Sequence, residues 1–139
     1  MFRGANAGLG LFILRVVVGV VFVMHGLGKL IGAPFVGGGM DGTIAFFTQV
    51  GIPMPNIAAW GVALVESLGG LALILGAGLP IVPLLLAIDI AVAILVLKFR
   101  LGKGFGGGYE FELTLLAGTL CLMMAGPGIL ALQIRPRNN

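Results

Sequence analysis

Three charged residues interrupt long apolar segments of this chain, and they constrain its fold more than any other feature. Arg15 lies within residues 9–31, Glu66 within 57–77 and Asp89 within 80–99. A charge at the centre of a membrane helix costs roughly 2.5–3.5 kcal/mol on insertion scales. We therefore expect these side chains to face one another rather than lipid, and to mark a functional site.

The composition is that of an integral membrane protein. Of the 139 residues, 59% are hydrophobic and 9% are charged, and the mean hydropathy is +1.17. A soluble domain carries about 25% charged residues, so this chain cannot cover a water-facing surface. The net charge of +3 comes without a basic run, which favours the lipid bilayer as partner and excludes nucleic acid.

Four segments are long enough to cross about 30 Å of hydrocarbon as helices. The sequence thus predicts an all-α membrane protein, a four-transmembrane-helix bundle that forms one domain over residues 1–139. Residues 76–80 predict a tight hairpin, and the Gly-Pro-Gly at 126–128 predicts the end of the last helix. The predicted spans are 9–31, 57–77, 80–99 and 109–126.

The connection over residues 32–56 is the longest. Ile44, Phe47 and Val50 recur at helical spacing before Gly51, which indicates a short helix in the membrane interface between the first two spans. An ordinary loop is an equally good interpretation. An even number of spans places both termini on one side, but the distribution of Lys and Arg does not decide the orientation.

Small and polar residues form stripes on two of the spans. Along the first span, Arg15 and Lys29 share one face with Gly19, Phe22 and Gly26. Such glycines let another helix approach closely. In the second span, alanines and glycines flank Glu66 in the same way, at positions 59, 63, 69 and 70. These two faces are therefore expected to meet.

The orientation of the polar residues is less clearly indicated in the last two spans. On the fourth, Glu110 shares a stripe with Thr114, Gly118 and Cys121, which makes it the better inward candidate than Glu112. Asp89 has mostly bulky neighbours, so it pairs across the bundle or lies at a subunit contact. Cys121 has no CxxC partner or metal-ligand spacing, and the simplest interpretation is a buried, small apolar residue.

Depth along the helices predicts a polar cavity on the side of the glycine-rich loop, residues 99–108. His25, Lys29, Glu66 and Glu110 would line it. Each has a structural alternative. Lys29 and Glu110 also suit anchors at helix ends, His25 an interhelical hydrogen bond, and Arg15 a structural ion pair with Glu66.

With these residues placed, the chain resembles the DoxX family of small four-helix membrane proteins over essentially its whole length. The motifs that carry the resemblance are R-x9-HG-x2-K from 15 to 29, DGT at 41–43, GIPMP at 51–55, ALVESLGGLALILG at 63–76, GGYEF at 107–111 and GPG at 126–128. The resemblance implies a multi-pass protein of a bacterial-type plasma (inner) membrane. Glu66 and Glu110 match the acidic positions of the family, and Arg15 and Lys29 the basic ones. The chain departs from the family after residue 128, where ILALQI replaces the usual Ser-Leu-Asp.

Members of this family include membrane subunits linked to thiosulfate–quinone oxidoreduction and anchors for soluble sulfur-transfer and superoxide-detoxifying enzymes. The first hypothesis is therefore a non-catalytic membrane subunit or anchor of a redox, thiol-stress or sulfur-oxidation complex, with soluble or membrane redox proteins as partners. A second is an oxidoreductase subunit that binds a quinone or another small molecule, with His25 and Glu66 handling protons. A third is a small transporter, which would require a homo-oligomer. No metal site is expected, and the candidate polar cluster is Arg15, His25, Lys29, Glu66, Asp89 and Glu110.

Overall fold

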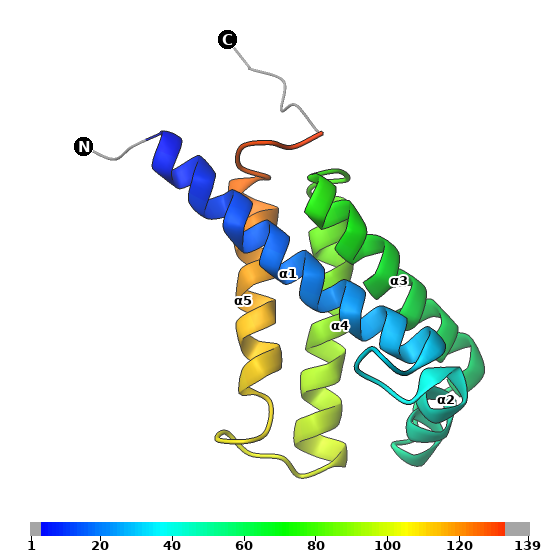
Figure 1. The fold of residues 1–139 in the computed structure, drawn as a ribbon. Helices are drawn as coiled ribbons and strands as arrows, with labels where there is room; N and C mark the ends of the chain where they lie inside the picture. The colour runs from blue at the N-terminus through cyan, green and yellow to red at the C-terminus, as the bar shows by residue number, and fades with distance from the viewer. Residues whose placement is uncertain (1–3, 133–139) are drawn as a thin grey trace.

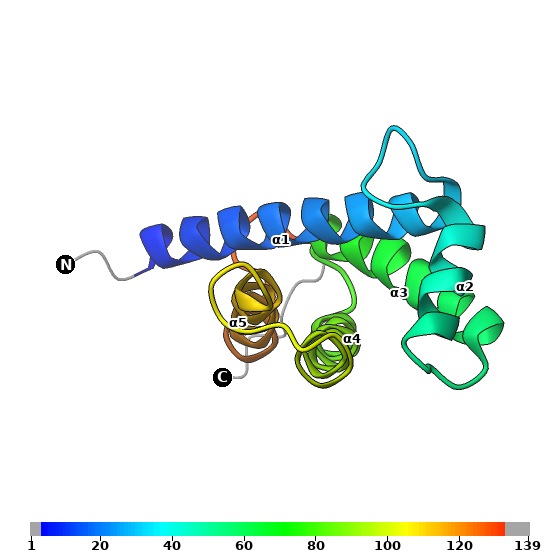
Figure 2. The ribbon, with the colours of Figure 1, turned by 90° about the horizontal axis from the view of Figure 1, so that it is seen from below.

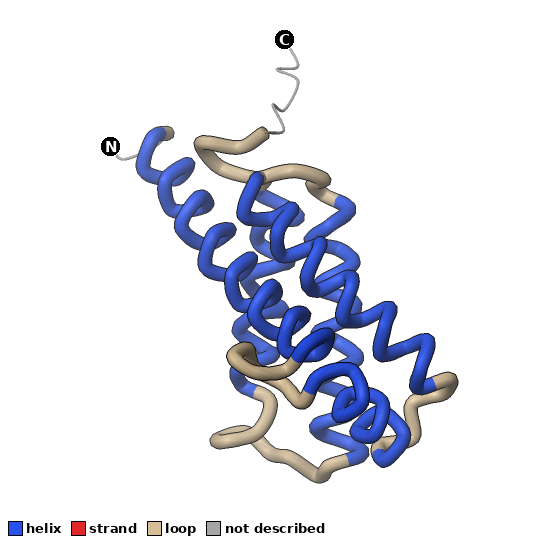
Figure 3. Tube along the Cα trace, turned by 45° about the vertical axis from the view of Figure 1, so that its right-hand side comes forward, coloured by secondary structure: helices blue, strands red, loops and turns tan. Residues whose placement is uncertain are grey.

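The structure, a computed structural model, describes residues 4–132, and all regular structure within them is helical. The prediction of an all-α protein is confirmed for this part of the chain. Figure 1 shows the order of the elements, and Figure 3 shows the loops between them. The elements are α1 (Ala5–Ile31), α2 (Gly39–Gln49), α3 (Pro55–Leu75), α4 (Ile81–Leu95), a π-helical turn η1 (Val96–Arg100) that continues α4, and α5 (Glu110–Ala125).

Within residues 4–132, three helical segments are long and apolar enough to cross a membrane, namely Asn6–Ile31, Pro55–Leu75 and Ile81–Arg100. These candidates coincide closely with the first three predicted spans, and their length and composition are those of a membrane protein. The fourth predicted span is also a helix, but α5 has 16 residues and is about 24 Å long at 1.5 Å per residue. It is shorter than the hydrocarbon layer of about 30 Å, because Gly126 ends it.

The four long helices form two antiparallel pairs. α1 packs along α3, and α4 packs along α5 (Figure 1). Seen from below, α4 and α5 are viewed almost end-on while α1 and α3 run across the view, so the two pairs are strongly inclined (Figure 2). The beginning of α1 and the end of α5 lie at one end of the bundle, which we call the terminal end. The connection from η1 to α5 lies at the other, the loop end.

Glycines bring α1 and α3 close together, as their stripes predict. A methyl group added to Gly19 would lie 2.7 Å from the carbonyl oxygen of Gly70, and one added to Gly26 would collide with Ser67. Since no side chain larger than hydrogen fits at these positions, the two backbones meet directly. Phe22, on the same face of α1, belongs to the hydrophobic core.

The helix ends follow the sequence signals. Gly76 ends α3 in the left-handed conformation (φ 71°), and Pro80 immediately precedes α4, which confirms the predicted hairpin. α2 confirms the short helix predicted within residues 32–56, and it packs against α3 and the end of α1. Its predicted position in the membrane interface stays a prediction.

The buried face of α5 differs from the predicted one. Leu115, Gly118, Thr119 and Leu122 are buried, whereas Cys121 is exposed. Thr114 and Ala125 are also exposed. The prediction of a buried Cys121 is therefore wrong. The large side chains of Leu115 and Leu122 fill the core, and they decide which face of α5 is buried.

Candidate functional site

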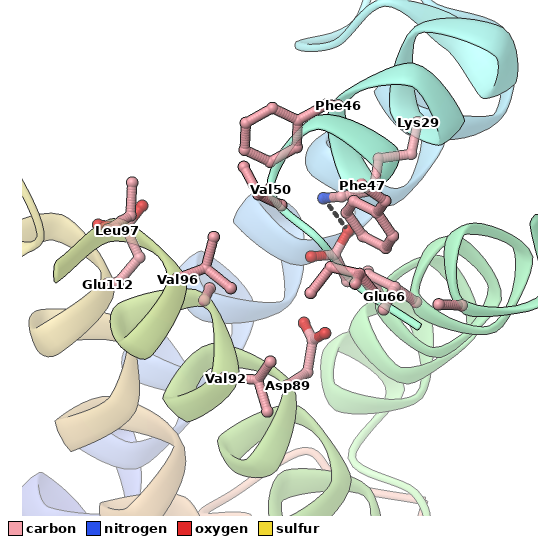
Figure 4. A pocket seen from close by; sticks show the side chains of 14 residues that line it. Lys29, Phe46, Phe47, Val50, Glu66, Asp89, Val92, Val96, Leu97 and Glu112 are labelled. Atoms are coloured by element: carbon pink, nitrogen blue, oxygen red, sulfur yellow. Dashed lines mark hydrogen bonds and ion pairs between the residues drawn. The ribbon is translucent and has the colours of Figure 1, made fainter. Parts of the chain in front are cut away.

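A cavity of about 320 Å³ lies at the loop end, where the α1–α3 pair diverges from α4 and η1. Most of its wall is apolar and comes from α2, α3, α4 and η1. Figure 4 shows four polar side chains around it, one each from α1, α3, α4 and α5. The residues that line it are Lys29, Phe46, Phe47, Val50, Ile52, Ala58, Val62, Glu66, Asp89, Val92, Ala93, Val96, Leu97 and Glu112.

Lys29 and Glu66 form an ion pair at the inner wall of this cavity. Lys29 Nζ donates a hydrogen bond of 2.6 Å to Glu66 Oε2 (Figure 4). The Lys29 side chain is 21% exposed and that of Glu66 is 6% exposed. The close approach of α1 and α3 brings the last turn of α1 beside the middle of α3. Glu66 therefore pairs with Lys29, and the alternative of an Arg15–Glu66 pair is wrong.

Asp89 reaches the same cavity from α4. Its carboxyl group points toward Glu66 (Figure 4), close enough for the two groups to interact electrostatically. Of the two interpretations offered by the sequence, the structure favours a contact across the bundle. Two facing carboxyl groups repel each other when both are charged, so a proton or a hydrogen-bond donor between them is stabilising.

Glu112 is the fourth polar group, and it lines the cavity in place of Glu110, the glutamate predicted to face inward. The Oε2 atom of Glu112 is buried and has no hydrogen-bond partner among the described residues. Glu112 also lines a smaller chamber of about 90 Å³, which shares Lys29, Glu66 and Ala93 with the main cavity. A buried, unpartnered carboxyl oxygen is costly, which makes this atom a candidate ligand contact.

Glu110, the predicted inward residue, instead binds the loop before α5. Its two carboxyl oxygens accept hydrogen bonds from the backbone N–H groups of Gly107 and Gly108. These two hydrogen bonds tie the Glu110 carboxylate to the backbone of the glycine-rich loop. Being the first residue of α5, Glu110 folds back over the glycine-rich turn, so it does not line the cavity.

His25 lines the smaller chamber, together with Lys29, Glu66 and Glu112. Its ring centre lies 5.8 Å from that of Phe111. His25 therefore lies near Lys29 and Glu66, and its predicted role in proton transfer stays a prediction.

Arg15 lies apart from this group. It is 14 residues before Lys29 on α1, which corresponds to about 21 Å along the helix. Arg15 is fully buried, and its Nη1 and Nη2 atoms donate hydrogen bonds of 2.7 and 2.9 Å to the carbonyl oxygens of Pro127 and Leu130. It thus holds the segment after α5 against α1 at the terminal end, and it is not part of the cavity.

The arrangement defines what the cavity can bind. Three carboxyl groups and one ammonium group converge on a space whose other walls are apolar and include Phe46 and Phe47. The cavity therefore suits a small molecule with an apolar ring and polar oxygens, held where protons can be exchanged.

The fold and the cavity define a class: a small helical membrane protein with an acidic site inside the bundle. The sequence model of the DoxX family matches residues 10–98, and the chain belongs to this family. A Bacillus subtilis (strain 168) protein named "Putative oxidoreductase CatD" is 35% identical over 125 residues, covering 90% of this chain and 85% of that protein. We found no solved structure that matches the chain.

Proposed function

We propose that this chain is the membrane subunit of an oxidoreductase and that its loop-end cavity binds a quinone. The observation that carries the proposal is the cavity itself, in which the unpartnered Glu112 oxygen and the Lys29–Glu66 pair meet an aromatic, apolar wall. The name of the B. subtilis relative, an oxidoreductase, and the family of the chain support the same class of function.

The dimensions and hydrogen-bonding groups suit a quinone ring. A volume of about 320 Å³ is at the small end of ligand pockets, which range over roughly 300–1,000 Å³. The Lys29 ammonium group has three N–H donors and forms one hydrogen bond to Glu66. It therefore has donors left for a quinone oxygen, and the rings of Phe46 and Phe47 offer stacking surfaces.

The carboxyl groups would handle protons. Reduction of a quinone to a quinol takes up two electrons and two protons, and Asp89 and Glu112 are carboxyl groups that line the cavity from the neighbouring helices α4 and α5. The electrons would come from a redox partner, soluble or membrane-bound, that docks on this subunit. We further propose that α5 serves as the fourth span and that the protein resides in a bacterial plasma membrane.

Glu112→Gln tests this proposal, with Glu110→Gln as a matched control. Both glutamates lie in the first turn of α5, but only Glu112 faces the cavity. We expect ubiquinone-1 to bind the wild-type protein in lipid nanodiscs, as measured by titration calorimetry. Glu112→Gln should weaken binding of the reduced form, ubiquinol-1, about tenfold, which corresponds to 1.4 kcal/mol, because the Glu112 carboxylate can accept a hydrogen bond from a quinol hydroxyl group, and a hydrogen bond to a charged group contributes about 1.5–3 kcal/mol. It should also reduce the pH dependence of the affinity.

The control should change neither the affinity nor its pH dependence. Absence of saturable binding to the wild-type protein would refute the proposal, as would equal effects of the two variants. Purification from native membranes in mild detergent addresses the partner. Co-purification of a redox protein together with extractable quinone supports both parts of the proposal. A redox partner without quinone would instead support an anchor.

A further inference from the structure

On one side of the cavity, α2 and η1 make no contact with each other within the described part of the chain, residues 4–132. The cavity lies between α2 and η1, yet α2 contacts α1 and α3, while η1 contacts α4. Phe46 of α2 and Val50, the residue after α2, face Val96 and Leu97 of η1 across this gap (Figure 4). The gap between α2 and η1 is therefore an opening into the cavity.

At the loop end of the bundle, one side chain crosses this opening. Arg100, the last residue of η1, extends to the turn after α2, where a methyl group added to Gly51 would lie 3.4 Å from Arg100 Nη1. Since Arg100 ends the third candidate span, its charge suits the level of the lipid headgroups. The part of the opening that is farther from the loop end than Arg100 then lies at the depth of the hydrocarbon.

The rim of the opening is apolar and exposed. Phe46 is 41% exposed and Val92 is 47% exposed, and both line the cavity. Val92 also belongs to the span Ile81–Arg100. A rim of this kind inside a membrane contacts acyl chains, so a molecule dissolved in the bilayer meets no polar barrier there.

We infer that the cavity is reached sideways from the bilayer, through the gap between α2 and η1. The inference about the ligand rests on the proposed function: the quinone is a membrane-dissolved one with an apolar tail. The cavity has room for a ring and a few attached groups, so a long tail must leave through the gap and lie along its apolar rim.

Fluorescence quenching by lipids brominated on their acyl chains tests the opening without any quinone. Trp60 is the single tryptophan, so Trp60→Phe provides a background in which Phe47→Trp reports on the cavity. Phe99→Trp, at an exposed position of η1, and Phe22→Trp, in the core, are matched controls. We expect the reporter at position 47 to lose more than half of the fluorescence lost at position 99, and the reporter at position 22 to lose almost none.

A covalent bridge across the gap shows which route the lipid takes. Cys121 is the single cysteine, so Phe46→Cys and Leu97→Cys in a Cys121→Ala background can be joined by a short bismaleimide. Joining them should abolish quenching at position 47 and leave quenching at position 99 unchanged. Quenching at position 47 no greater than at position 22, or quenching that survives the bridge, would overturn the lateral opening.

The ligand is tested separately with two quinones that share a headgroup, decylubiquinone and the tail-less ubiquinone-0. We expect decylubiquinone to bind at least tenfold more tightly in nanodiscs, and the bridge to prevent its binding when formed beforehand. Equal affinities would overturn the tailed ligand. Quenching through the gap without binding of either quinone would refute the proposed function and leave the lateral opening standing.

Discussion

The Lys29–Glu66 pair provides the sharpest test of how the inner wall of the cavity is held together. The perturbation is a double-mutant cycle of Lys29→Met and Glu66→Leu, each of which removes one charge while keeping an apolar side chain of similar length. The two groups are bonded at 2.6 Å and largely shielded from solvent, with side-chain exposures of 21% and 6%. The two single changes should therefore have unequal effects.

Lys29→Met leaves the buried Glu66 facing Asp89 without a counter-charge. Breaking a buried pair from one side costs about 3–5 kcal/mol, and the partial exposure of Lys29 favours the lower end, about 3 kcal/mol. Glu66→Leu leaves Lys29, which can still reach Asp89 or the headgroups, so we expect a loss of about 1 kcal/mol. The double variant should lose about 1 kcal/mol or less, because replacing a whole buried pair by apolar residues is often neutral.

The coupling energy is therefore expected to be about 3 kcal/mol, at the upper end of values measured for residues in contact. It is measured from reversible unfolding in mixed micelles with rising SDS, followed by circular dichroism. Lys103→Met, in the exposed loop after η1, is the control and should change stability by less than about 0.5 kcal/mol. Additive single effects, or equal losses in the two single variants, would refute the reasoning.

Three further predictions follow from residues outside the cavity. Arg15→Met should lower the free energy of unfolding by about 2–3 kcal/mol, since it removes two charge-assisted hydrogen bonds, and should leave ubiquinone-1 affinity unchanged in the same calorimetric titration. Gly19→Leu should lower the free energy of unfolding by about 1–3 kcal/mol or more, because the larger side chain forces α1 away from α3. Gly10→Leu, at a position with open space around it, should lower it by less than about 0.5 kcal/mol. Unfolding in SDS measures both values. Cys121 is exposed on the lipid-facing side of α5, so Cys121→Leu should change the free energy of unfolding by less than about 0.5 kcal/mol in the same SDS titration, and a loss of more than about 1 kcal/mol would contradict the placement of α5.

Much of the fold could be predicted because membrane helices are governed by length, hydropathy and breakers. The stripe from Arg15 to Lys29 showed which face of α1 meets α3, since glycines at helical spacing have few other uses in lipid. The same reasoning failed on α5. There, small residues lie on a lipid-facing side, and the choice of buried face depends on the volumes of Leu115 and Leu122 in a core formed with other helices.

The wrong buried face of α5 also led to the prediction that Glu110, rather than Glu112, lines the cavity. Glu112 lies three residues before Leu115 and seven before Thr119, both of which are buried. This helical spacing puts Glu112 on the buried face of α5, and it is the signal in the sequence that distinguishes Glu112 from Glu110. Arg15 was assigned to the cluster because a buried charge suggests a partner of opposite sign. Arg15 instead donates hydrogen bonds to backbone carbonyl groups of the segment that follows α5. The sequence does not show which carbonyl groups come within hydrogen-bonding distance when the chain turns back after a helix.

The most direct test of the central claim fills the cavity and measures quinone binding. Ala93 lines both the main cavity and the smaller chamber, whereas Ala117 lies on the exposed face of α5. Ala93→Phe places a ring in the proposed site, and Ala117→Phe places the same ring in lipid. The account predicts that decylubiquinone binding in nanodiscs is lost in Ala93→Phe and retained in Ala117→Phe, with both proteins folded by circular dichroism. Undiminished binding to Ala93→Phe would contradict it.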